Sequence, residues 1–262
     1  KKNFVSFFLS DGDNIQWMMQ DFASRYYDVP EAEDVKMTFG LPVATLAMMA
    51  PVQFNNLMGL QKQNCSLMEM LGGGYYYVDT YSQDHNRKTN LRVAAKRLAV
   101  SMRQYQIKLL GIMAMDVKSE AAKEAYQVYV DANDQLEGIV VLQYSPYAGG
   151  EGEVFWVTNK AGYDIPVITV KYSLWDRIHE REGSPDFIAS KLKEEAQEES
   201  FSVVCVHAWS RFAGDTYGAS AAKRCAERLD DRFEAINMQE LVWRLRMSRR
   251  PEQTLDYLNK IY

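Results

Sequence analysis

Short apolar runs alternate with longer amphipathic stretches along most of this chain. Such an alternation favours a parallel sheet whose strands are joined by crossover helices. Several of the runs are apolar nearly throughout, which is typical of strands covered on both faces. The pattern predicts strands over residues 4–10, 36–41, 66–71, 108–115, 138–144, 166–172, 202–207 and 233–237.

Apolar residues recur at helical spacing between these strands. Leu91, Leu98 and Met102 share one stripe, for example, and Ser119 and Ser184 stand where helix N-caps are favoured. The main predicted helices cover residues 91–105, 119–132, 185–197 and 216–229.

Eight strand–helix units in 262 residues predict a single-domain (β/α)8 barrel over residues 1–262, similar to the TIM barrel. A doubly wound open parallel sheet is the alternative. Two connections, 42–64 and 144–164, are long. The second contains the apolar run 154–157, which fits either an additional hairpin strand or an arm over the site.

The charge balance limits the possible partners. A net charge of −5 and an isoelectric point near 5.4 argue against a nucleic-acid partner. The basic cluster 244–250 is predicted to be a solvated helix end. No apolar run is long enough to span a membrane.

The three cysteines lack metal-ligand spacing. Cys205 is expected to be a buried thiol, and a disulfide between Cys205 and Cys225 is left open.

Polar and aromatic residues gather where the predicted strands end, which is where a barrel carries its chemistry. In chain order the candidates are Asp11, Asp13, Asn14, Glu69, Tyr75, Tyr77, Asp116, Tyr144, Lys171, Trp175, His207 and Trp209. Paired carboxylates can protonate or attack a glycosidic bond, and flat rings can stack on the apolar faces of sugars.

Several candidates also have a structural interpretation. Asp11 is a possible cap for a helix that starts near Asn14, and Asp116 is a possible turn residue. His207 can be a core histidine, and the tyrosines can be core or platform. Glu69 interrupts an apolar run and is expected to face the barrel interior, where burial would raise its pKa.

The sequence contains none of four common motifs for nucleophilic catalysis, nucleotide binding or zinc-dependent hydrolysis. It lacks a GxSxG elbow, a Walker A loop, an HExxH motif and a GxGxxG turn after the first strand. We therefore expect no cofactor. A protein-bound metal is not expected either, although Asp11, Asp13 and His207 together form a set of oxygen and nitrogen donors.

Two segments resemble a known family. Gly72-Gly73-Gly74-Tyr75-Tyr76-Tyr77 is similar to the GxGYxY core of the motif that names the GxGYxYP putative glycoside hydrolases, with Val78 in place of the final proline. Residues 8–17, 40–42, 50–51, 172–175 and 206–210 also resemble segments of that family, so the likeness covers nearly the whole chain.

The resemblance implies the C-terminal domain of a longer protein, with an N-terminal domain absent from this chain. It also implies a carbohydrate substrate and a secreted or cell-envelope location in bacteria.

Three functions follow from these residues. The first is a glycoside hydrolase with Asp13 and Asp116 as its acid/base pair, Asp11 orienting the substrate, and Glu69 as a further candidate carboxylate. The aromatic residues with Asn14, Lys171 and His207 would then bind the sugar. The alternatives are a non-catalytic carbohydrate-binding domain and a metal-dependent hydrolase or deacetylase using Asp11, Asp13 and His207.

Overall fold

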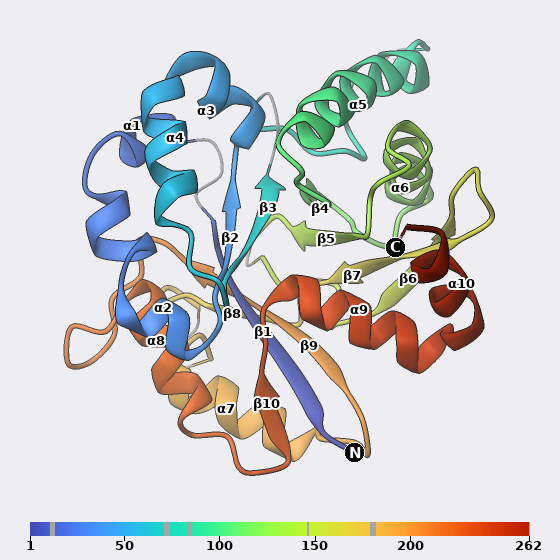
Figure 1. The fold of residues 1–262 in the computed structure, drawn as a ribbon. Coiled ribbons are helices and arrows are strands. Elements are labelled where there is room, and N and C mark those ends of the chain that lie inside the picture. Colours follow the sequence, from blue (N-terminus) through green and yellow to red (C-terminus); the bar gives the residue numbers. More distant parts are fainter. Residues whose placement is uncertain (11–13, 71–73, 83–84, 146, 179–181, 262) are drawn as a thin grey trace.

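The computed structural model describes residues 1–261 apart from 11–13, 71–73, 83–84, 146 and 179–181 (Figure 1). Its sheet has the strand order β6-β7-β5-β4-β3-β2-β1-β9-β8, and every pair is parallel except β6–β7. The strands are β1 (Asn3–Ser10), β2 (Thr38–Leu41), β3 (Ser66–Met70), β4 (Leu109–Ala114), β5 (Gly138–Gln143), β6 (Val154–Thr158), β7 (Asp164–Thr169), β8 (Tyr172–Leu174), β9 (Phe201–His207) and β10 (Phe233–Ala235).

Helices surround this sheet, and those from α1 to α8 lie between strands along the chain (Figure 1). They are α1 (Ile15–Met18), α2 (Pro30–Asp34), α3 (Val43–Met49), α4 (Pro51–Leu60), α5 (Arg87–Gln104), α6 (Glu120–Ala132), α7 (Pro185–Glu194), α8 (Gly218–Ala226), α9 (Met238–Arg249) and α10 (Pro251–Ile261), with a π-helical turn at Ala23–Tyr27. Among the described residues, no helix is both long and apolar enough to cross a membrane.

One extended segment brings the two ends of the sheet together. Its first half, β7, pairs with β5, and its second half, β8, pairs with β9. The joint bonds to both neighbours, because Val170 N donates to Val141 O and Lys171 N donates to Val203 O. The parallel strands therefore curl into a barrel, which confirms the predicted fold class.

The core has two layers because alternate residues of each strand face opposite sides of the sheet. Along β1, Phe4 and Phe8 join an interior cluster, whereas Val5, Phe7 and Leu9 join the larger cluster between sheet and helices. Strands buried on both faces need apolar residues at nearly every position, which is the pattern that the sequence shows.

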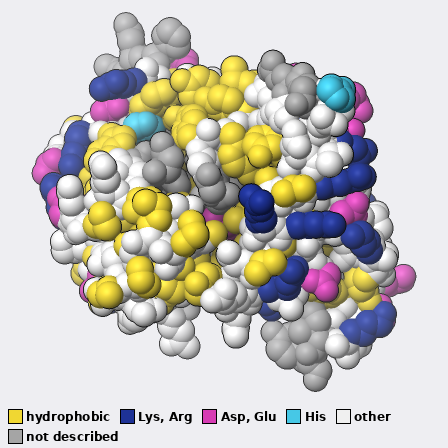
Figure 2. All heavy atoms as spheres, turned by 90° about the horizontal axis from the view of Figure 1, so that it is seen from above, with side chains coloured by type: hydrophobic (Ala, Val, Ile, Leu, Met, Phe, Trp, Pro, Cys, Tyr) yellow, Lys and Arg dark blue, Asp and Glu magenta, His cyan; other side chains and the backbone are white. Residues whose placement is uncertain are grey.

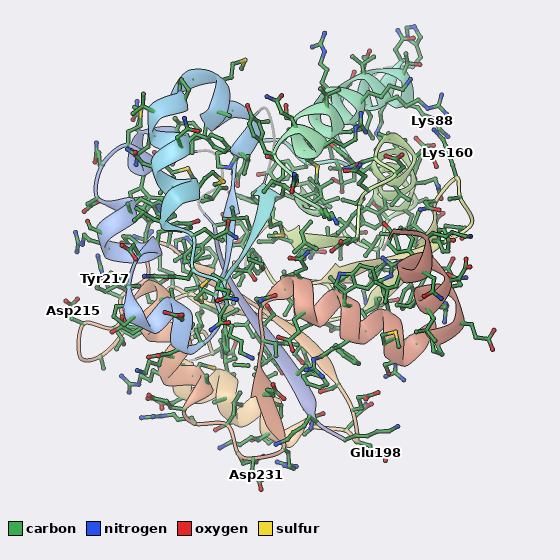
Figure 3. The ribbon with its side chains drawn as sticks, in the orientation of Figure 1. Lys88, Lys160, Glu198, Asp215, Tyr217 and Asp231 are labelled. Carbon is green, nitrogen blue, oxygen red and sulfur yellow. The ribbon has the colours of Figure 1, made fainter. Side chains whose placement is uncertain are left out.

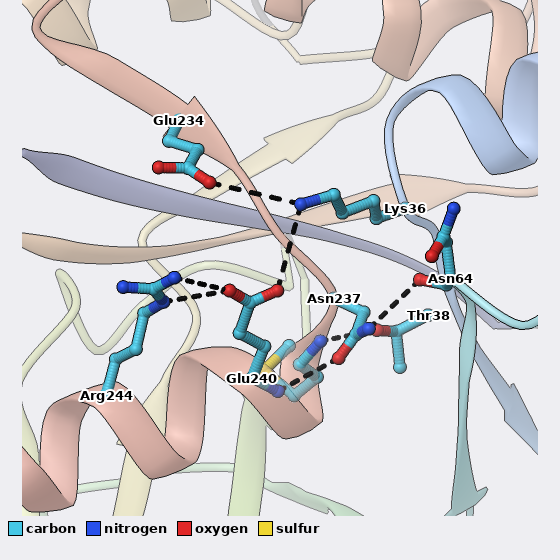
Figure 4. Close-up of polar contacts among 8 residues, drawn as sticks. Lys36, Thr38, Asn64, Glu234, Asn237, Glu240 and Arg244 are labelled. Carbon is cyan, nitrogen blue, oxygen red and sulfur yellow. Dashed lines mark hydrogen bonds and ion pairs between the residues drawn. The ribbon is translucent and has the colours of Figure 1, made fainter.

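The N-terminal end of the barrel is covered by α9. Asn237 caps this helix by accepting from Glu240 N, and it donates to Asn64 O beside β3 (Figure 4). Met238 N donates to Thr38 Oγ1 on β2, so the start of α9 is tied to the strand ends. The predicted eighth strand, β10, pairs with the first residues of β1, along the same edge of β1 that β2 pairs with further on. The chain then continues from β10 into α9.

The predicted helices are present, with Ser119 and Ser184 as the N-caps of α6 and α7. The apolar run 154–157 proves to be a hairpin strand, β6. The three cysteines are free, and Cys205 faces the barrel interior while Cys225 lies in the outer layer, so the bridge left open by the sequence is not formed.

The prediction of a wholly solvated basic cluster was wrong for Arg246. Only 1% of this residue is exposed, and its guanidinium lies 4.6 Å from the ring of Trp243 and 4.8 Å from the ring of Tyr257. This arginine holds α9 against α10 through contacts with both aromatic faces.

Candidate active site at the barrel mouth

Aromatic rings from separate strand ends meet at the C-terminal mouth of the barrel. Tyr77 follows β3, Tyr144 and Tyr147 follow β5, and Trp175 follows β8. Consecutive ring centroids lie 5.2 Å apart for Tyr77–Tyr144, 6.1 Å for Tyr144–Tyr147 and 5.4 Å for Tyr147–Trp175, and Tyr75 lies 5.7 Å from Tyr77. We call these five residues the mouth cluster. Hydrophobic side chains, a class that here includes tyrosine and tryptophan, also gather on this side in the view from above (Figure 2).

The three tyrosines of the GxGYxY segment point to two different sides of the barrel wall, the mouth and the outer layer. Tyr75 and Tyr77 belong to the mouth cluster, whereas Tyr76 points outward, where its ring lies 5.0 Å from that of Tyr81 and its hydroxyl bonds to Tyr129 on α6. The segment is fixed to the barrel because Val78 N donates to Met113 O at β4. This short stretch therefore separates the mouth from the outer layer.

His207, the last residue of β9, stacks on Trp175 with 4.9 Å between ring centroids and 13° between ring planes. Its Nδ1 lies 3.3 Å from Ser210 Oγ, and that hydroxyl donates to Asp176 Oδ1 at 3.2 Å. Because the hydroxyl proton is engaged by the carboxylate, Nδ1 carries the ring proton and Nε2 is left as an acceptor. Burial lowers the pKa of His207, more strongly than Asp176 raises it, so the neutral ring prevails at pH 7.

Trp175 is held by its backbone as well as by its ring. Trp175 N donates to Gly183 O at 3.2 Å, and a Cβ added at Gly183 would lie 1.9 Å from Trp175 O. Only glycine fits at this close approach. The segment before α7, through Gly183, therefore fixes the position of the Trp175 backbone at the mouth.

Asp116 is exposed at the end of β4, where its Oδ1 accepts from Lys118 N at 2.9 Å. Its own N–H, together with that of Met115, donates to the carboxylate of Asp79. Asp79 thus joins the loop after the GxGYxY segment to the end of β4. The predicted turn geometry of Asp116 is present, and it places this carboxylate on the rim.

The expectation that Glu69 faces the barrel interior was wrong. Its neighbours Met68 and Met70 take the inward positions of β3, so Glu69 points to the outer layer, where Oε2 accepts from Ala44 N at 3.0 Å in the first turn of α3. The residue is fully buried, and this desolvation raises its pKa to about 8, against the opposing effect of the α3 backbone donors. Glu69 lies beneath α3 and is not part of the mouth.

Three further predicted binding residues have other contacts. Lys171 lies at the height of Val203 on β9, below the mouth, and its ammonium pairs with Glu195 at 2.9 Å. Asn14 fills the cap position considered for Asp11, because its Oδ1 accepts from Trp17 N. Trp209 is half exposed on the rim, with its ring 4.9 Å from that of Trp17.

Asp11 and Asp13 lie outside the described residues. Within the described ranges, no group of three histidine, cysteine, aspartate or glutamate side chains is arranged to hold a metal ion. The sequence did not single out Tyr147, Ser210 or Asp176 as site residues. The positive φ of Tyr147, 67°, marks a constrained loop, yet no sequence pattern reveals it.

Comparisons with known proteins agree with this fold. Residues 1–246 match the family described as the GxGYxYP putative glycoside hydrolase C-terminal domain. Among solved structures, Puue allantoinase is similar, with a TM-score of 0.55 and 13% identity over 95% of this chain and 91% of that chain. A probable polysaccharide deacetylase from Pseudomonas aeruginosa PAO1 has a TM-score of 0.50 and 10% identity over 95% and 92%. At these identities the likeness concerns the fold alone. No curated protein matches the chain.

Proposed function

Since the chain belongs to the GxGYxYP putative glycoside hydrolase family, we propose that its barrel mouth binds a glycan and hydrolyses a glycosidic bond. The mouth cluster is the observation that carries this proposal. Tyr75 and Tyr144 are exposed at 43% and 41%, so their rings are accessible at the mouth. Aromatic rings with polar edges suit sugar rings, which have apolar faces and a rim of hydroxyls.

The proposed acid/base pair is Asp13 and Asp116. The carboxylate of Asp79 already accepts hydrogen bonds from two backbone amides, and Glu69 is buried beneath α3. Among the described carboxylates at the ends of β3 and β4, Asp116 is therefore the one that is accessible on the rim. Asp11 and Asp13 follow β1 directly, and β1 ends beside His207 in the register of β9. In this arrangement neutral His207 accepts a hydrogen bond from a sugar hydroxyl through Nε2.

A second function is favoured by the acceptor nitrogen of His207 and by the fold shared with a probable polysaccharide deacetylase. In this alternative Asp11, Asp13 and His207 hold a divalent metal, and the reaction removes an acyl group from a sugar. The neutral ring with Nδ1 protonated fits a metal ligand. Metal binding would supply a polarised water for that hydrolysis.

The test compares turnover and binding on one panel of glycosides and acetylated sugars. We expect Asp13→Asn to lower kcat by about 10²–10⁴-fold with binding retained. Trp175→Ala weakens binding, whereas Trp156→Ala is the matched control, because this half-buried tryptophan lies on β6 opposite Pro166 at the other end of β7.

Three outcomes contradict the proposal in different ways. Binding without turnover by the unmutated protein assigns a carbohydrate-binding domain. Turnover of acetylated sugars that EDTA abolishes and a divalent cation restores assigns the metal-dependent alternative. Equal binding losses in Trp175→Ala and Trp156→Ala remove the mouth as the sugar site.

A further inference from the structure

A cavity lies on the outer side of Tyr75–Tyr77, between α3 and α5. Its volume is about 480 Å³, within the about 300–1,000 Å³ of small-molecule sites. Thr45 and Met48 of α3, Tyr76 and Tyr81 of the connecting segment, and Arg97 and Ser101 of α5 contribute to its walls. We call it the α3–α5 pocket.

This pocket is separate from the mouth, although the two share a wall. Tyr75 and Tyr77 face the mouth cluster, while Tyr76 between them lines the α3–α5 pocket. The hydroxyl of Tyr76 is fixed by Tyr129, and its ring is tilted against Tyr81. The pocket thus has aromatic faces that are already held in place.

The charge of the pocket is positive. Arg97 is the one charged side chain lining it within the described part of the chain, and no ion pair or hydrogen bond engages its guanidinium there. On the same helix, Arg87 and Lys88 pair with Glu124, and Arg103 pairs with Asp134. Arg92 and Lys96 of this helix, like Arg97, make no ion pair with a described residue, but they do not line the pocket. Arginine is well suited to a carboxylate, which it can bind through two parallel hydrogen bonds.

The remaining walls suit the body of a sugar. The hydroxyls of Thr45 and Ser101 make no side-chain hydrogen bond with any described residue, so they can donate to and accept from ligand hydroxyls. The α3 wall is anchored by the bond from Ala44 N to Glu69. That carboxyl is neutral at pH 7 because burial raises its pKa, and it therefore does not repel an anion.

We propose that the α3–α5 pocket binds a carboxylate-bearing sugar of the hexuronate class, with Arg97 holding the carboxylate and Tyr76 and Tyr81 contacting the ring. The choice of an anion follows from the pocket alone. The choice of a sugar rests on the proposed function.

The experiment is calorimetric titration with methyl β-D-glucuronide and methyl β-D-glucoside, which differ only in the carboxylate. We expect the unmutated protein to bind the glucuronide at least about tenfold more tightly, since charge-assisted hydrogen bonds are the strong ones. Arg97→Gln removes this preference. Arg92→Gln, which changes an exposed arginine of the same helix outside the pocket lining, keeps it.

Trp175→Ala separates this proposal from the proposed function, because it alters the mouth and leaves the α3–α5 pocket intact. Glucuronide preference that survives Trp175→Ala and disappears in Arg97→Gln supports the proposal, even if the mouth hydrolyses nothing. Loss of the preference in Trp175→Ala, its persistence in Arg97→Gln, or no preference in the unmutated protein overturns it. Equally tight, Arg97-dependent binding of cyclohexanecarboxylate overturns the assignment to a sugar.

Discussion

Replacing Glu69 by glutamine removes a buried acid while keeping its shape and its hydrogen bond. The amide oxygen of glutamine can still accept from Ala44 N, which Glu69 Oε2 does now at 3.0 Å. The other oxygen, Oε1, is buried and has no hydrogen-bond partner among the described residues. We therefore expect the variant to fold and to differ from the unmutated protein mainly in its response to pH.

The size of the effect follows from the pKa of Glu69. Burial raises it from 4.5 in the unfolded chain to about 8 in the folded protein. A group with a raised folded pKa contributes stability that is fully present below the unfolded value and is lost as the pH rises through the folded value. At about 1.36 kcal/mol per pKa unit, the unmutated protein loses about 3 kcal/mol of unfolding free energy from Glu69 between pH 5 and pH 8.

The assay is urea unfolding of both proteins at pH 5, 6, 7 and 8. Other titrating groups are common to the two proteins, so the difference in unfolding free energy isolates Glu69. We expect Glu69→Gln to gain about 3 kcal/mol relative to the unmutated protein between pH 5 and pH 8. The control is Glu198→Gln, which removes a carboxylate from the surface (Figure 3) and leaves Glu69 in place. A difference between Glu69→Gln and the unmutated protein that stays constant with pH would refute the reasoning.

Three other substitutions test packing, two of them beside the mouth and one between α9 and α10. Gly183→Ala brings a Cβ within 1.9 Å of Trp175 O, so we expect a loss of about 1–3 kcal/mol in thermal unfolding and weaker glycan binding. Asp79→Ala removes the acceptor of two backbone amides at the end of β4; a cost of about 1–3 kcal/mol and slower turnover are expected, and unchanged stability would contradict the role assigned to this carboxylate. Arg246→Ala empties the space between two aromatic rings and is expected to cost about 2–5 kcal/mol in urea unfolding, whereas Arg249→Ala at an exposed position of the same helix stays within about 0.5 kcal/mol.

The barrel could be predicted from the sequence because its strands appear as short runs of apolar residues. Strands β1, β4, β5 and β9 are covered on both sides, so most of their residues are apolar and the runs are easily recognised. The capping serines of α6 and α7 were found for a similar reason, since a cap bonds to a backbone amide three residues away.

The positions of Glu69 and Lys171 needed the tertiary structure. In a strand buried on both faces, the sequence does not show which alternate set of residues points inward, because both sets are apolar. Glu69 therefore looked like an interior acid although it bonds to α3. Lys171 looked like a rim residue because the predicted strand ran to residue 172, whereas the segment changes partners from β5 to β9 at this point.

By itself, the sequence determined most of the strands, helices α5 to α8, the parallel arrangement of the strands, and that tyrosines follow the glycines. The connection 42–64 looked like a long loop, whereas it forms α3 and α4, and α9 and α10 were not predicted. The mouth cluster, the arrangement of His207 with Ser210 and Asp176, and the α3–α5 pocket were decided only by the tertiary structure. Secondary structure follows from neighbours a few residues apart. A site is made by residues tens of positions apart, and their proximity depends on how the strands register and how the barrel closes.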